Sequence, residues 1–157
     1  MATIIEIRNQ QKKVPLPLHR ILPLIRTVLK AEGVTRAELS VVFVTDSQMR
    51  VLNRRYLQHG RPTDVLAFDL READGSRPRG AAKGNQVEGE IVISAMTAAR
   101  QAKEYQTTPA QEIVLYVVHG ILHLCGYDDH GRQNIKRMRA REREIMAILE
   151  TRRLFPL

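Results

Sequence analysis

Tryptophan is absent from this chain of 157 residues, and aromatic side chains make up only 4% of it. So few rings argue against a surface that recognises bases by stacking them on aromatic side chains. The single cysteine, Cys125, cannot form an internal disulfide, so the fold needs no oxidising compartment, and we interpret this thiol as buried filler. No apolar run approaches the roughly 20 residues that cross a bilayer, and no signal peptide is evident. These absences predict a soluble, cytoplasmic protein without a membrane partner.

Basic side chains are in excess. The 25 Lys and Arg residues exceed the 17 Asp and Glu residues, which gives a formal net charge of +8. Such a balance favours polyanionic partners, nucleic acid among them. Apolar residues make up 43% of the chain and charged residues 27%, an ordinary globular composition at a length typical of one domain. We therefore expect a single domain over residues 1–157.

Hydrophobic periodicity predicts four strands and five helices. The strands are expected over residues 3–8, 39–44, 65–70 and 90–94, and the helices over 18–29, 46–56, 96–105, 109–126 and 132–152. Strands and helices that alternate in this way predict an α/β or α+β domain, with one small mixed four-stranded sheet covered by about five helices.

The clearest chemical signal is a group of three histidines around the end of the fourth predicted helix. His119 and His123 are four residues apart, so both imidazoles lie on one helix face and can reach one metal ion. Gly126 can end the helix in a left-handed conformation and turn the chain back, so that His130 or Asp129 completes the set. Three protein ligands leave one position for water, as in catalytic zinc sites.

The cluster differs from the His-Glu-x-x-His motif of zinc peptidases, because position 120 is glycine and the carboxylate that acts there as general base is missing. A hydrolase with this site needs the metal alone, or a carboxylate from elsewhere, to deprotonate its water. Glu112, two turns before His119 on the same predicted helix, is one candidate, and Glu90 is another.

Several segments are similar to one known family. The sequence HGILHLCGYD at residues 119–128 resembles the signature of the YbeY family of bacterial metallo-endoribonucleases. LNRRY at 52–56, PTDVLAF at 62–68 and GEIVIS at 89–94 are similar to family segments in the same order, and matches at 101–102 and 112–118 extend the resemblance over about residues 45–145. A collinear set of this kind is far more specific than a single motif.

This resemblance implies an α+β fold, a metal site usually assigned to zinc, and cleavage of single-stranded RNA in ribosomal RNA maturation and ribosome quality control. We accordingly expect one Zn2+ per chain, held by His119, His123 and His130. The implied partners are single-stranded RNA, ribosomal RNA and the ribosome, with no DNA specificity.

Two positions depart from the family pattern. The family commonly has its third histidine directly after Tyr-Asp, where this chain has Asp129, with His130 one residue later. We favour His130 as the third ligand, and Asp129 is the alternative. The family arginine that follows the tyrosine of the Leu-Asn segment would fall on Leu57, whose side chain cannot hold a phosphate. Arg54, Arg55 or Arg61 would have to replace it.

The sequence thus supports a metal-dependent endoribonuclease with Glu112, Arg55 and Arg61 as candidate catalytic residues. Two alternatives belong to other classes. A zinc-dependent peptidase-like hydrolase would suit the histidines equally well, although Gly120 and the basic charge argue against it. A non-enzymatic ribosome assembly factor would hold its metal in a closed structural site with four protein ligands.

Overall fold

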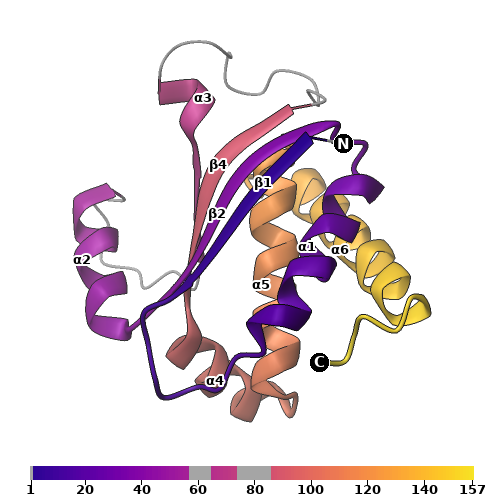
Figure 1. The fold of residues 1–157 in the computed structure, drawn as a ribbon. Helices are drawn as coiled ribbons and strands as arrows, with labels where there is room; N and C mark the ends of the chain where they lie inside the picture. The colour runs from indigo at the N-terminus through magenta and orange to yellow at the C-terminus, as the bar shows by residue number, and fades with distance from the viewer. Residues whose placement is uncertain (1, 57–64, 74–85) are drawn as a thin grey trace.

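The computed structural model describes residues 2–56, 65–73 and 86–157. One mixed sheet forms the middle of the molecule, and helices lie on both of its faces (Figure 1). Arg61, which is among the expected catalytic residues, lies outside the described residues, as do Leu57 and the segment 62–64.

The sheet has four strands in the order β1-β2-β4-β3. β1 (Ala2–Asn9), β2 (Arg36–Val44) and β4 (Gln86–Ser94) are parallel to one another, whereas β3 (Val65–Asp69) pairs antiparallel with β4 at the edge. The four expected strands and the mixed sheet are confirmed. β2 and β4 each begin a few residues earlier than expected, since they pair from Arg36 and Gln86 onward. The first residues of both strands include polar side chains that face outward, which weakens the hydrophobic pattern used to predict a strand.

Three helices cover one face of the sheet: α1 (Leu18–Ala31), α5 (Pro109–Leu124) and α6 (Arg132–Thr151). Their buried side chains share one hydrophobic core with the strand residues that point toward them. α2 (Asp46–Tyr56) lies on the opposite face over a smaller apolar cluster, and α4 (Ala95–Tyr105) leads into α5 (Figure 1). With the four-residue α3 (Leu70–Ala73), the described residues confirm five longer helices and an α+β fold.

Local sequence explains where these helices begin. Thr108 caps α5 by accepting a hydrogen bond from the backbone N–H of Gln111, whose side chain in turn accepts one from the backbone N–H of Thr108. This capping box satisfies two N–H groups that a helix end otherwise leaves unpaired. Thr45 caps α2 in the same way with Gln48. α1 continues as one helix through Pro23.

A polar network joins the starts of α2 and α4, where β2 and β4 end. The Asp46 carboxylate accepts hydrogen bonds from Arg100, at 2.6 Å, and from the buried Ser94 hydroxyl, at 2.9 Å. These donors stabilise the ionised carboxylate, and the bond from Arg100 contributes most, so the pKa of Asp46 lies below its ordinary value. The network fixes the two helix starts relative to each other.

Two glycines allow α5 to approach the sheet closely. A Cβ atom on Gly120 of α5 would lie 2.8 Å from Cγ2 of Ile91, and one on Gly89 of β4 would lie 2.8 Å from the side chain of Leu124. Contacts this short require the surrounding atoms to move. Glycine at position 120 therefore serves the packing of the helix that carries His119 and His123.

Candidate metal centre

His119 and His123 lie on the same face of α5, as their spacing predicts. Their Nε2 atoms are 3.0 Å apart, and the rings meet edge to face with centroids separated by 4.5 Å. The side chains are 24% and 27% exposed, so each ring is packed on one side and reaches solvent on the other. The helix thus presents two imidazole nitrogens toward one point at the surface.

The chain reverses directly after α5. The N–H of Gly126 donates to the carbonyl of His123, and the N–H of Tyr127 donates to the carbonyl of Leu122, each at 3.0 Å. Gly126 has a φ of 102°, a positive backbone angle that glycine adopts readily because it has no Cβ atom. This pair of bonds is the Schellman arrangement of a helix end and confirms that Gly126 ends the helix.

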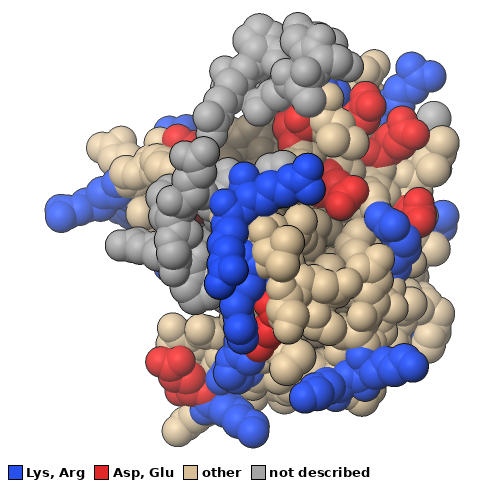
Figure 2. Space-filling model, turned by 90° about the vertical axis from the view of Figure 1, so that its left-hand side faces the viewer, with Lys and Arg blue, Asp and Glu red and all other residues tan. Residues whose placement is uncertain are grey.

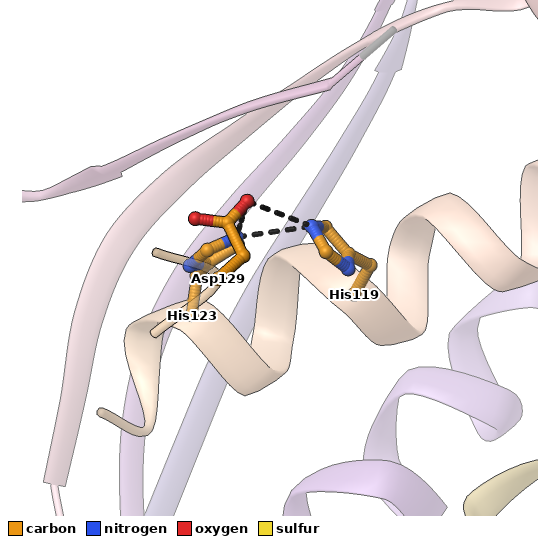
Figure 3. A group of neighbouring side chains, drawn as sticks. All are labelled: His119, His123 and Asp129. Carbon is orange, nitrogen blue, oxygen red and sulfur yellow. Dashed lines mark hydrogen bonds and ion pairs between the residues drawn. The ribbon is translucent and has the colours of Figure 1, made fainter. Parts of the chain in front are cut away.

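The reversal returns Asp129 to the two histidines (Figure 3). Asp129 Oδ2 lies 3.4 Å from His123 Nε2 and 3.9 Å from His119 Nε2, and the three residues form a group that could hold a metal ion. A tetrahedral ion with bonds of about 2.0–2.1 Å separates its ligand atoms by about 3.4 Å. The observed separations of 3.0, 3.4 and 3.9 Å lie around that value, so the residues fit a single ion.

His130, the expected third ligand, points elsewhere. Its Nδ1 lies 2.7 Å from Oδ1 of Asp128 and 3.5 Å from Oδ1 of Asp129, and its side chain is 83% exposed. The structure therefore brings Asp129, the alternative from the sequence, to the two helix histidines. Asp128, Asp129 and His130 form a second group that could hold a metal ion, and all three of these side chains are exposed.

Sequence reasoning missed Glu142 of α6. Its Oε1 lies 2.7 Å from Nδ1 of His119, and the residue is buried. A signal was present, because Glu142 falls at helical spacing between Met138 and Ile145, on the stripe that α6 buries in the core. An acidic residue on such a stripe predicts a specific partner.

The two carboxylates considered from the sequence occupy different surroundings. Glu112 is buried in the first turn of α5, where its Oε1 accepts a hydrogen bond of 2.7 Å from the Thr107 hydroxyl. Glu90 lies on β4 between Gly89 and Ile91, which both face α5. Because successive residues of a strand point to opposite faces, the side chain of Glu90 projects from the other face of the sheet. Neither belongs to the His119, His123 and Asp129 group.

Burial and electrostatics favour a neutral His123. Removal from water disfavours the imidazolium form, and the neighbouring His119 disfavours it further, so the pKa of His123 lies below its ordinary value despite the opposing effect of Asp129. A neutral imidazole is the form that binds a metal ion.

Basic side chains are prominent on the face that carries α2. Figure 2 shows Lys and Arg side chains running down this face in a band. α2 has three exposed arginines, at positions 50, 54 and 55, and α6 exposes Lys136, Arg139 and Arg143 elsewhere on the molecule. In the described parts of the chain, no helix is both long and apolar enough to cross a membrane.

The fold and the site together define an α+β protein with a candidate metal centre of two imidazoles and one carboxylate. Residues 6–150 match the family model described as Endoribonuclease YbeY. The chain belongs to this family of RNA-cleaving hydrolases, which confirms the resemblance found in its sequence and argues against the peptidase alternative.

Curated relatives agree over most of the chain. The chain is 38% identical over 148 residues to the Endoribonuclease YbeY of Geobacter metallireducens, covering 93% of this chain and 95% of the relative. It is 40% identical over 155 residues to that of Moorella thermoacetica, covering 94% and 97%. A Thermotoga maritima protein known from a solution structure shares the fold, with a TM-score of 0.59 and 22% identity over 98% of this chain and 97% of that one.

Proposed function

We propose that this protein is a metal-dependent endoribonuclease that cleaves single-stranded RNA in ribosomal RNA maturation and ribosome quality control, with one Zn2+ per chain held by His119, His123 and Asp129. The observation that carries the proposal is the close approach of three ligand atoms, at separations suited to one ion, in a chain of the Endoribonuclease YbeY family. Two imidazoles with one carboxylate are a ligand set that catalytic zinc sites use.

The geometry of the turn after α5 supports Asp129 over His130 as the proposed third ligand. Asp129 Oδ2 faces both Nε2 atoms, whereas His130 is hydrogen-bonded to Asp128 by its Nδ1. An aspartate also brings one negative charge to the site, which offsets part of the charge of a divalent cation. It occupies the sequence position at which the family commonly has its third histidine, so no inserted residue needs to be absorbed.

The site is open enough for a polymeric substrate. Asp129 is 44% exposed and both histidines reach solvent, so an RNA phosphate can approach without a large rearrangement. When bound, the ion would polarise a phosphodiester oxygen or lower the pKa of a water ligand. The chain's own residues would hold the ion by two neutral imidazoles and one carboxylate, and both histidines and Asp129 reach solvent beside it.

Basic residues are proposed to hold the RNA backbone. A net charge of +8 and exposed arginines on α2 suit a substrate with one negative charge per nucleotide. Arg55 and Arg61 are proposed to contact phosphates near the cleaved bond, and Glu112 is proposed to accept or relay a proton. Weak sequence preference follows from backbone contacts, because phosphates carry no sequence information.

The test combines metal analysis with cleavage assays. Protein purified without chelators should contain close to one zinc per chain and cleave a labelled single-stranded RNA, while the matching DNA and a peptide mixture stay intact. His119→Ala and His123→Ala should lose both metal and cleavage, whereas His19→Ala, a change at an exposed histidine of α1, should lose neither. A metal-loaded wild type that cleaves no RNA would support the assembly-factor alternative, and metal-free active protein would overturn the metal centre.

A further inference from the structure

Glu142 interrupts an apolar stripe. On α6 it shares a buried helix face with Met138, Ile145 and Leu149, which are at most 1% exposed. The side chain of Glu142 is itself only 11% exposed. Taking a carboxylate out of water costs several kcal/mol unless strong hydrogen bonds compensate. An apolar side chain of similar size would pack at this position without that cost. The carboxylate therefore has a purpose other than filling the core.

The partner of this carboxylate is one atom of the candidate metal centre. Glu142 Oε1 lies 2.7 Å from His119 Nδ1, the length of a charge-assisted hydrogen bond. An ionised carboxylate can only accept, so Nδ1 must carry the proton. In a neutral imidazole the other nitrogen, Nε2, then has the free lone pair, and it is Nε2 that lies 3.0 Å from His123 and 3.9 Å from Asp129.

We propose that Glu142 is a positioning residue for the metal centre: it fixes His119 as the Nδ1–H tautomer and holds the ring so that Nε2 faces the ion. The inference rests on the proposed function, because it needs a metal at His119, His123 and Asp129. It assigns a role to α6, which supplies none of the three ligands. Carboxylate partners of metal-bound histidines act in this way, and their loss typically weakens metal binding 10–100-fold.

Two variants separate the hydrogen bond from the charge. Glu142→Met keeps the length and apolar packing of the side chain but removes the acceptor, and Glu142→Gln keeps a carbonyl oxygen that can accept from Nδ1. Glu144→Gln is the matched control, since it makes the same charge change two residues further along, at an exposed position. Zn2+ affinity is measured by competition with a chromophoric chelator. We expect about 10–100-fold weaker binding for Glu142→Met, a smaller loss for Glu142→Gln, and wild-type affinity for Glu144→Gln.

The tautomer is read directly in metal-free protein. Nitrogen-15 NMR of the imidazole rings at about pH 8 distinguishes Nδ1–H from Nε2–H. We expect His119 of the wild type to be the Nδ1–H form and Glu142→Met to lose this preference. The measurement on the wild type needs no variant to fold.

The outcomes separate this inference from the proposed function. If the wild type binds one zinc tightly and Glu142→Met binds it equally well, Glu142 does not position the ligand and the metal centre stands. If His119 is Nε2–H in the metal-free wild type, the inference is overturned whatever the metal affinity. If the wild type binds no metal at all, the proposed function fails, and with it the role assigned to Glu142.

Discussion

Gly120 of α5 packs against Ile91 of β4 so closely that a methyl group at position 120 would lie 2.8 Å from Cγ2 of the isoleucine. Ile91 is fully buried in the core, with little room to move. The residue between the two helix histidines is therefore restricted by the sheet beneath it. A glutamate at this position, as zinc peptidases have, could not be accommodated without separating the helix from the strand.

Gly120→Ala should accordingly destabilise the protein, by about 1–3 kcal/mol, although alanine favours a helix more than glycine does. Urea unfolding followed by circular dichroism measures the change. Ala110→Gly, at the less buried start of α5, is the comparison for helix propensity alone. A Gly120→Ala protein as stable as the wild type would show that Ile91 can move aside.

The third ligand can be decided by two single substitutions. Asp129→Ala should weaken Zn2+ binding strongly, because it removes an oxygen that faces both Nε2 atoms. His130→Ala should change the affinity far less, since this exposed side chain is paired with Asp128. Chelator competition measures both. The opposite order would restore His130 as the ligand and require the turn at 127–130 to rearrange around the ion.

Glu112 is predicted to take part in proton transfer. Glu112→Gln should lower the turnover of RNA while metal content and thermal stability stay near wild type, because the amide oxygen can still accept from the Thr107 hydroxyl. Thr107→Val removes the hydrogen bond that Glu112→Gln retains, and it keeps the carboxylate of Glu112. If Thr107→Val loses activity and Glu112→Gln keeps it, the contribution of Glu112 is structural, and if neither loses it, Glu112 has no part in catalysis.

Asp46 should make folding stability depend on pH in the acid range. Its folded pKa is lowered, chiefly by the hydrogen bond from Arg100, so its ionised form stabilises the fold above the pKa of the unfolded chain. That contribution is lost as the pH falls through the folded pKa, below about pH 4. Asp46→Asn should cost about 1 kcal/mol at pH 7, a modest value because Arg100 is exposed and solvent screens its charge.

Urea unfolding of both proteins between pH 7 and pH 3 tests this sign. The difference in the free energy of unfolding should be constant from neutral pH down to about pH 5 and should shrink below it. A difference that grows on acidification would contradict the prediction. Glu38→Gln, at an exposed position of β2, is the control for removing one carboxylate.

Arginines that contact phosphates should be visible in the salt dependence of RNA binding. Arg55→Ala and Arg61→Ala should each reduce the slope of log affinity against log salt by about one, since each contact releases counterions. Lys30→Ala, at the end of α1, should leave the slope unchanged. If Arg139→Ala lowers slope and cleavage while the first two do not, the RNA runs along α6.

Most of the fold was predictable from the sequence because its signals are local. Apolar spacing and Gly126 predicted α5 and its end, and the histidine spacing identified two of the proposed ligands. The choice between Asp129 and His130 depends on how the chain turns after Tyr127, which periodicity does not encode. The contact of Glu142 with His119 spans 23 positions, so it emerges only from the packing of α6 on α5.

The proposed ligands all come from one short stretch of chain, residues 119–129, at the end of a helix whose other residues are fixed by the core. Little chain entropy is therefore lost when the ligands are brought together, and the main core does not depend on the ion for its stability. Removal of the metal should open the turn at 126–131 locally and leave the sheet protected from hydrogen exchange. In this respect the site behaves unlike the structural zinc of a zinc finger, whose loss unfolds the whole domain.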